Sequence, residues 1–412
     1  MSLIATFLAL VFLFSLVSAR VGRTILTPPI LFTAAGAAVH WITAELGVHE
    51  GNADTFLALA EVGLVLLLFT DASRTDLGLL SNIRALPARL LGPGMLLTLV
   101  LGALAALVVF RQLTFWEAGI LAAILAPTDA GLGQIIVSSP RVPLKIREAL
   151  NVEAGLNDGL SVPFLLFFIA LAGSGLSGGT EASLHEFIWE QLGYGALVGL
   201  GIGLGGGWLL GRAHREQSVA ASWSQLGVVV LPLLCLVASE EVGASMFIAA
   251  FVVGLAVQVF FKQAGKHAIE FTEEWGQILN LSVFFLFGMI VARALPQFTA
   301  PHWVYAVLSL TIIRMLPVTV ALLGAGLSRA TVLFMGWFGP RGLASIVLTL
   351  VYLEHHAEHP GESTIRLAAM ATILLSIFLH GLTGRPGIDL YAKAVARLGP
   401  SAPEREGCGH TA

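Results

Sequence analysis

The chain alternates between long apolar stretches and short polar segments that hold most of its charged residues. A helix needs about 20 apolar residues to cross the hydrocarbon core of a bilayer, so each long stretch is a candidate membrane span. We predict thirteen transmembrane helices, at residues 2–19, 25–44, 55–72, 88–110, 115–138, 147–173, 189–211, 220–238, 243–261, 274–294, 303–325, 330–353 and 364–384. The predicted fold class is an all-α polytopic membrane protein, with residues 1–400 as one membrane unit and 401–412 as a short cytoplasmic tail.

Basic residues test this helix count, because the cytoplasmic loops of membrane proteins carry an excess of Lys and Arg. If the N-terminus lies outside, the loops and tail assigned to the cytoplasm hold 17 of the 22 Lys and Arg residues. An extra or missing helix would scramble this alternation. We therefore predict a multi-pass protein of a cell (inner) membrane, with the N-terminus outside and the C-terminus in the cytoplasm.

Composition excludes two broad classes of protein. The chain is 56% hydrophobic and 12% charged, whereas a soluble protein of 412 residues needs more charge to cover its surface. Its formal net charge of −4 gives no sign of nucleic-acid binding. The expected surroundings are a lipid bilayer, and no nucleic-acid partner is expected.

Three polar side chains stand inside the 147–173 helix, where a charge is unfavourable: Glu153, Asn157 and Asp158. At about 100° per residue, Glu153 and Asn157 share one helix face, and Asp158 points about 100° further round. The two carboxylates therefore serve different neighbours. We interpret Glu153 as half of a structural ion pair and Asp158 as a site residue that faces a cavity. The alternative is that both carboxylates only pair with arginines and hold helices together.

The 115–138 helix contains the string "ILAPTDAGLG". Pro127 removes one backbone donor and clashes with the preceding turn, and Thr128 and Asp129 follow it directly. We predict that the helix breaks here, which frees backbone carbonyls that can bind a small cation at mid-membrane. A simple kink in a packed helix is the alternative.

The 330–353 helix contains the string "WFGPRGLAS", in which Gly339 and Pro340 predict a second break with Arg341 beside it. Two interrupted segments at corresponding positions of two halves are the strongest sequence indication of a transport site. The spacing fits an inverted repeat of the first six and last six helices, with two crossed broken helices, the fifth and the twelfth.

Two further ionisable residues lie inside predicted helices. Arg314 lies well inside the 303–325 helix, and a buried Arg needs an anionic partner, for which we expect Glu153. Asp71 lies near the end of the 55–72 helix. Exposure to lipid headgroups explains Asp71 as well as a functional role does.

Five motifs together resemble one known family. The strings "LLLFTDASRTDL", "APTDAGLG", "EAGLNDG", "FFLFGMI" and "GPRGLAS" occur in this order and resemble the monovalent cation:proton antiporters, in their Asn-Asp branch of NhaP-like sodium/proton antiporters. The resemblance covers essentially the whole chain. It implies core helices at about 55–173 and 274–384, and dimerisation or scaffold helices at about 1–45 and 189–261.

The resemblance also implies roles for individual residues. Asp158 would bind the cation or the proton, with Asn157 beside it, and Thr128 would offer a further oxygen to Na⁺ at the helix crossing. Asp129 would lie at the same crossing, and Asp71 would lie near a cytoplasmic funnel. Glu153 and Arg314 would form the buried ion pair. The helix breaks would lie at Pro127, Gly339, Pro340 and Arg341.

The function that follows is secondary transport and not enzyme catalysis. The resemblance implies exchange of Na⁺ (or Li⁺) for H⁺ by alternating access, with both ions competing for Asp158 and no cofactor beyond the transported ions. One titrating carboxylate beside Asn157 indicates electroneutral exchange, and a homodimer is the expected assembly. Many NhaP-like members have Ser where this chain has Ala154, so exchange of K⁺ for H⁺ is the main alternative.

Other readings of the sequence are weaker. The strings G-x-G-x-x-G at residues 201–206 and H-x-x-E-H at 355–359 lack the strand or stable helix that a nucleotide site or a metalloprotease requires. An intramembrane serine protease would use the serines of "GSGLSGG" and His380, although those serines lie in a predicted loop. A channel would need an open polar lining, whereas the polar residues here converge on one site. The glycines repeated every fourth residue in the 189–211 helix predict either a dimer surface or internal packing.

Overall fold

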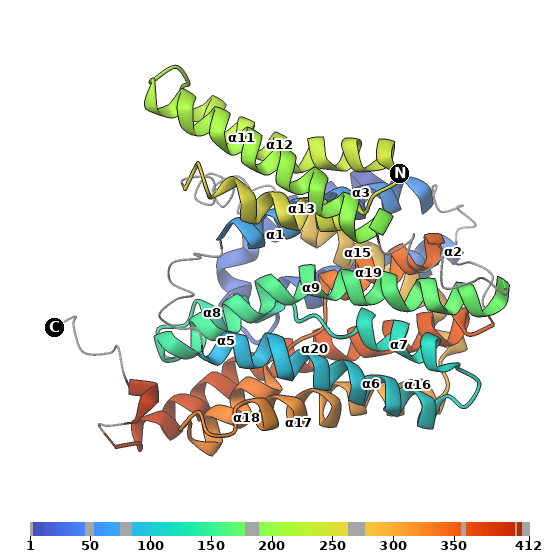
Figure 1. The fold of residues 1–412 in the computed structure, drawn as a ribbon. Helices are drawn as coiled ribbons and strands as arrows, with labels where there is room; N and C mark the ends of the chain where they lie inside the picture. Colours follow the sequence, from blue (N-terminus) through green and yellow to red (C-terminus); the bar gives the residue numbers. More distant parts are fainter. Residues whose placement is uncertain are drawn as a thin grey trace. The chain divides into compact units, whose positions relative to one another are not determined.

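Every regular element in the described part of the chain is a helix (Figure 1). This computed structural model describes residues 3–45, 53–74, 85–177, 189–262, 277–355, 360–399 and 402–405. Helices occupy each of the thirteen stretches predicted to cross a membrane, which confirms the predicted all-α fold class.

The helices up to the middle of the chain are α1 (Leu3–Val21), α2 (Pro28–Glu45), α3 (Ala53–Arg74), α5 (Ala85–Arg89), α6 (Met95–Val109), α7 (Phe115–Ile124), α8 (Ala130–Val137) and α9 (Leu144–Ser177). The later helices are α11 (Gly195–Arg215), α12 (Ala221–Val242), α13 (Met246–Val257), α15 (Gln277–Ala294), α16 (Ala300–Leu310), α17 (Ile312–Ala321), α18 (Arg329–Trp337), α19 (Leu343–His355) and α20 (Glu362–Ala396). Short π-helical segments at Leu90–Gly94 and Trp189–Tyr194 lead into α6 and α11, and 3₁₀ turns lie at Leu295–Gln297 and Pro403–Arg405.

The surface of these helices suits lipid. Eight helices or continuous helical runs in the described residues are long and apolar enough to cross a membrane, and three shorter apolar helices accompany them. Large apolar side chains stand on their outer faces, for example Phe12 on α1, Val108 on α6 and Trp223 on α12. A contiguous apolar surface of this kind is rare on a soluble protein.

The chain divides into two compact units. The first comprises residues 1–56, 83–157 and 281–412, and the second comprises residues 57–82 and 158–280. Helix α9 contributes its N-terminal part to the first unit and its C-terminal part to the second. The predicted division into core helices and scaffold helices stays a prediction.

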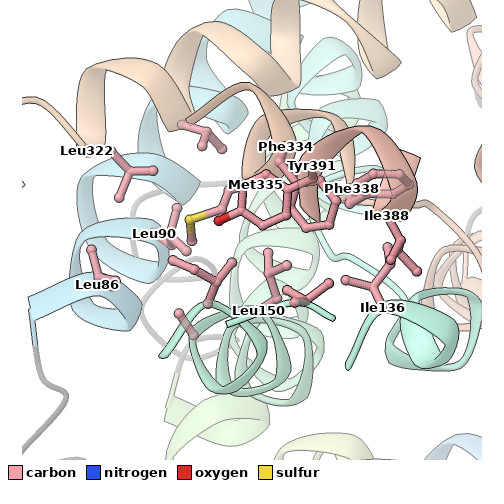
Figure 2. Close-up of a cluster of buried hydrophobic side chains, with 14 residues drawn as sticks. Leu86, Leu90, Ile136, Leu150, Leu322, Phe334, Met335, Phe338, Ile388 and Tyr391 are labelled. Atoms are coloured by element: carbon pink, nitrogen blue, oxygen red, sulfur yellow. The ribbon is translucent and has the colours of Figure 1, made fainter. Parts of the chain in front are cut away.

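A hydrophobic cluster in the first unit holds the end of α18 in place (Figure 2). The rings of Phe334 on α18 and Tyr391 on α20 stack with centroids 4.1 Å apart, and the ring of Phe338 packs against Phe334 in a tilted arrangement with centroids 4.7 Å apart. Ile136 of α8 and Leu150 of α9 belong to the same cluster. The cluster therefore fixes α18 next to α8 and next to α9, which carries Glu153, Asn157 and Asp158.

The second unit is built on a glycine face. Gly199, Gly203 and Gly207 of α11 are buried, and a Cβ on Gly199 would lie 2.6 Å from the carbonyl oxygen of Ala249 on α13. A side chain at these positions would push α13 away, so glycine lets the two backbones approach closely. Of the two alternatives left open by the sequence, the structure shows internal packing for this face. The predicted homodimer stays a prediction, and this glycine face gives it no support.

One interruption was not predicted. The 303–325 stretch is two helices, α16 and α17, with Thr311 between them at φ −109° and ψ −90°. Two predicted features lie outside the part of the chain whose side chains the structure describes: the H-x-x-E-H string at 355–359 and the serines of "GSGLSGG". The structure describes only residues 402–405 of the predicted tail.

Candidate functional site

Two interrupted helices meet in the first unit, as predicted. The helical pair α7 and α8 is interrupted at residues 125–129, and the pair α18 and α19 is interrupted at residues 338–342. Each interruption contains a proline that cannot continue the helical hydrogen bonds, Pro127 in one and Pro340 in the other. The backbone N–H of Asp129 donates to the carbonyl of Pro340 at 2.8 Å, so the two interruptions are in direct contact.

Asp129 joins two helix N-termini. Its Oδ1 accepts a hydrogen bond from the backbone N–H of Leu132, at the start of α8, at 2.9 Å. Its Oδ2 accepts from the backbone N–H of Leu343, the first residue of α19. The N-terminal end of a helix carries partial positive charge, so one buried carboxylate neutralises two such ends. Both oxygens of Asp129 already have protein donors.

Arg341 contacts the C-terminal end of α7, on the other side of the same interruption. Its Nη1 donates to the carbonyls of Ala126 at 2.5 Å and Pro127 at 2.9 Å, just beyond the end of α7. These carbonyls lack helical partners because the helix is interrupted, and the guanidinium charge matches the negative end of the helix dipole. At these two residues, the carbonyls that were predicted to bind a cation therefore accept hydrogen bonds from Arg341 instead.

Asn157 ties α9 to the first interruption with both atoms of its amide. Its Oδ1 accepts from the backbone N–H of Thr128 at 3.2 Å, and its Nδ2 donates to the Thr128 hydroxyl at 2.8 Å. Both residues are buried, with 1% and 3% of their surface exposed. The next residue on α9 is Asp158, which is also buried at 3% exposure. The hydroxyl of Ser161 donates to the Asp158 carbonyl and is thus engaged within the helix.

Glu153 and Arg314 form a bidentate ion pair. Nη1 of Arg314 lies 2.5 Å from Oε1 of Glu153, and Nη2 lies 2.9 Å from Oε2. The two residues are 2% and 4% exposed. A planar guanidinium matched to both carboxylate oxygens is the strongest form of such a contact. The pair joins α9 to α17 one turn before Asn157.

A small cavity of about 20 Å³ lies beside these residues. Room of this size admits about one water molecule. Ala154 contributes a methyl group to its wall. Its lining residues are Thr128, Asp129, Gly133, Ile136, Val137, Leu150, Glu153, Ala154, Phe338 and Pro340.

Two interrupted helices that meet at their breaks are typical of secondary transporters. Comparison with protein families shows which family the chain belongs to. The family described as "Sodium/hydrogen exchanger, transmembrane" matches residues 6–388. The chain belongs to the sodium/hydrogen exchanger family. It is therefore a polytopic membrane protein of a transporter family, and the predicted resemblance is confirmed.

Individual relatives of this exchanger-family chain share about a quarter of its sequence. It is 26% identical over 272 residues to "K(+)/H(+) antiporter NhaP2" of Shewanella sp. (strain MR-4), a match that covers 65% of this chain and 46% of the relative. It is 24% identical to "K(+)/H(+) antiporter NhaP" of Alkalimonas amylolytica, over 90% of this chain and 63% of the relative. The aligned part thus spans about half the length of the first of these relatives.

A solved structure has the same fold. The sodium proton antiporter MjNhaP1 from Methanocaldococcus jannaschii at pH 8 superposes with a TM-score of 0.72, over 94% of this chain and 98% of that one. The two sequences are 19% identical, so the likeness concerns the fold. It supports the predicted all-α architecture with interrupted helices.

One predicted site residue lies on α3, and the structure adds a pair of residues that the sequence analysis did not assign to the site. Asp71 lies buried near the end of α3 in the second unit. Ser376 and His380, one turn apart on α20, contact the second interruption through hydrogen bonds. The only signal in the sequence was two polar residues at i and i+4 in an otherwise apolar helix.

Proposed function

We propose that this chain is a secondary transporter that exchanges Na⁺ (or Li⁺) for H⁺, with the two ions competing for Asp158. The observation that carries the proposal is the contact between Asn157 and Thr128, which ties the residue next to Asp158 to the junction of two interrupted helices. Membership in the sodium/hydrogen exchanger family supports it.

The available oxygens suit a hard monovalent cation. A hydroxyl has two acceptor lone pairs, so the Thr128 oxygen that accepts from Asn157 keeps one for an ion. The carboxylate of Asp158 and water supply the remaining oxygens. A carboxylate holds a proton or a cation but hardly both, so competition at Asp158 gives obligatory exchange. Rigid rocking of one helical bundle against another exposes the site alternately to each side.

The exchange we propose is electroneutral. Asn157 does not titrate, Glu153 is held by Arg314, and both oxygens of Asp129 accept backbone hydrogen bonds. Of the predicted cation site, Asp158 is then the carboxylate that takes up and releases protons. One proton exchanged for one monovalent cation moves no net charge, so the rate should not respond to a membrane potential.

K⁺ is the second candidate for the transported cation, and one feature favours it. Ala154, which lines the cavity beside the junction, offers no hydroxyl oxygen to a cation where many NhaP-like members have Ser. The relatives from Shewanella and Alkalimonas are named as K⁺/H⁺ antiporters.

The decisive experiment uses the purified protein in liposomes with a trapped pH-sensitive dye. Na⁺, Li⁺ and K⁺ are added separately at several pH values, with and without an imposed membrane potential. We expect saturable proton movement with at least one cation, at a rate independent of potential. Protein that moves no protons with any of the three cations would refute the proposal, and a rate that follows the potential would refute its electroneutrality.

We also propose a homodimer in a cell (inner) membrane, with the N-terminus outside. Single cysteines introduced near each end of the chain, labelled in intact cells by a membrane-impermeant reagent, test the orientation. Labelling of only the C-terminal position would show the opposite orientation. Light scattering of the detergent complex, corrected for bound detergent, tests the dimer.

A further inference from the structure

Two polar side chains of α20 bracket the second helix interruption. His380 Nε2 lies 2.8 Å from the carbonyl oxygen of Trp337, the last residue of α18. The Ser376 hydroxyl accepts a hydrogen bond from the backbone N–H of Arg341 at 2.7 Å. His380 and Ser376 are themselves joined, with Nδ1 of His380 3.1 Å from the Ser376 hydroxyl.

These contacts form one consistent hydrogen-bonded chain. A carbonyl only accepts, so His380 Nε2 carries the hydrogen that reaches Trp337. In the neutral ring Nδ1 is then an acceptor, and the Ser376 hydroxyl donates to it while accepting from Arg341. Nδ1 also lies 3.1 Å from the backbone carbonyl oxygen of Ser376, which receives no hydrogen from the ring in this tautomer. His380 and Ser376 are 2% and 0% exposed. Unpaired backbone groups at this depth would be unfavourable. Ser376 satisfies the backbone N–H of Arg341, and His380 gives the carbonyl of Trp337 a second donor beside the backbone N–H of Gly339, which lies 3.0 Å away.

The bracketed segment in turn sets the position of the first interruption. The carbonyl of Pro340 accepts from the backbone N–H of Asp129, and the guanidinium of Arg341 donates to the carbonyls at the end of α7. A shift of residues 338–341 therefore shifts the backbone around Thr128. The path from His380 to Thr128 runs through these hydrogen bonds and the short backbone stretches between them, all within the first unit.

We propose that His380, acting through Ser376 and the backbone of residues 338–341, is a positioning residue for the cation site. The proposal rests on the exchange activity proposed above. Its role is to hold the two interruptions in register, without carrying a proton itself. Loss of His380 therefore weakens cation binding more than it slows the exchange cycle.

The chain offers a conservative variant and a matched control. In H380Q one amide supplies a donor for Trp337 and an acceptor for Ser376, with a spacing close to that of the two ring nitrogens. H380L supplies neither. T383V removes a different hydrogen bond between the same two helices, from the Trp337 indole N–H to the Thr383 hydroxyl at 3.0 Å, and leaves the interruption untouched.

The test measures the cation concentration that gives half-maximal exchange in liposomes, for whichever of Na⁺, Li⁺ and K⁺ the wild type exchanges. For H380L we expect this concentration to rise about tenfold, the effect of losing one or two buried hydrogen bonds, with the maximal rate within about twofold. H380Q and T383V should stay within about twofold of the wild type in both. If H380Q is as impaired as H380L, His380 carries a proton and the proposal is overturned. If H380L exchanges cations like the wild type, His380 does not position the site, which also overturns the proposal.

A second measurement does not depend on transport. Hydrogen–deuterium exchange of the peptides that contain residues 338–343 and 125–133 should be faster in H380L and in S376A than in the wild type and T383V. S376A also serves if H380L fails to fold, because it removes the contacts of the Ser376 hydroxyl with Arg341 and His380 and leaves the contact of His380 with Trp337 in place. Equal protection in all variants would overturn the positioning role, whereas a wild type that exchanges no cation would refute the proposed function and leave this measurement as the test.

Discussion

Gly339 lies directly against the guanidinium of Arg314. A Cβ built on Gly339 would lie 2.3 Å from Nε of Arg314, closer than real Cβ atoms approach any neighbour. Arg314 is held by both oxygens of Glu153, so it has little freedom to move aside. Glycine at this position therefore lets the second interruption cover the buried ion pair.

We predict that G339A destabilises the protein by about 1–3 kcal/mol, the usual effect of overpacking a closed site. The control is G133A on α8, where a new Cβ meets nothing within 4 Å and alanine favours the helix by about 0.5–1 kcal/mol. Thermal unfolding of the detergent-solubilised protein should show a lower midpoint for G339A and an equal or higher one for G133A. Equal midpoints for G339A and the wild type would show that Arg314 moves aside freely.

Removing one partner of the buried ion pair should cost far more than removing an exposed one. E153A leaves the Arg314 charge buried without its partner carboxylate, which typically destabilises a protein by about 3–5 kcal/mol. The matched control is R141A, which breaks the pair of Arg141 and Asp389, whose side chains are each 53% exposed. An exposed pair contributes about 0–1 kcal/mol. We expect E153A to lower the unfolding midpoint strongly and R141A hardly at all.

A double variant distinguishes an unpaired charge from lost packing. E153L combined with R314M removes both charges and fills similar volume, so it should recover most of the stability that E153A loses. Stability as low in the double variant as in E153A would show that the pair itself, and not the unpaired charge, maintains the fold.

Asp129 and Asp158 should respond differently to the same substitution. D129N replaces one of two acceptor oxygens with a donor, so it loses an N-terminal cap on α8 or α19 at about 0.5–2 kcal/mol. D158N keeps the shape of its side chain and removes the titrating charge, so it should fold normally and lose cation-dependent proton exchange. Thermal unfolding tests the prediction for D129N, and the liposome assay tests the prediction for D158N. Normal exchange by D158N would refute the assignment of Asp158 as the ion-binding carboxylate.

The sequence predicted the helices and the interruptions because each has a local cause. Apolar runs of membrane length define the spans, and Pro127 and Pro340 cannot continue a helix wherever they are placed. The expectation that Glu153 is the partner of Arg314 followed from charge balance alone, since a buried guanidinium requires an anion. The structure shows these two side chains in contact.

Contacts between distant segments were beyond the sequence pattern. Nothing near Arg341 indicates that its guanidinium binds the carbonyls of Ala126 and Pro127, because the two segments are more than 200 residues apart. Thr311 interrupts its helix without a proline or glycine at that position, so no local signal marked it. The sequence placed His380 one helical turn after Ser376 in an apolar helix, and only the fold brings it to the Trp337 carbonyl.

A carboxylate near the C-terminus caps α18, the helix that leads into the second interruption. Oε1 of Glu404 accepts from the backbone N–H of Ser328, the N-cap of α18, at 2.7 Å and from the Thr331 hydroxyl at 2.8 Å. Burial alone would raise the pKa of Glu404, but the hydrogen bonds from Ser328 and Thr331 outweigh it and lower the pKa below its ordinary value of 4.5. The folded protein therefore holds this carboxylate in its charged form.

This lowered pKa makes part of the stability depend on pH. As the pH falls below about 4.5, the unfolded chain binds a proton at Glu404 before the folded protein does, so stability is complete above that pH and is lost as the pH falls through the folded pKa. E404A removes both hydrogen bonds and should destabilise the protein by about 0.5–2 kcal/mol at neutral pH. E404Q keeps an acceptor oxygen without the charge, so its deficit in stability against the wild type should be smaller than that of E404A. This deficit should disappear in acid, where the wild type also loses the charge. The control is E216Q, at an exposed pair with Arg212, whose difference from the wild type should stay small throughout. Unfolding midpoints measured from pH 7 to well below 4.5 check this, and a deficit of E404Q that grows as the pH falls would contradict the sign argued here.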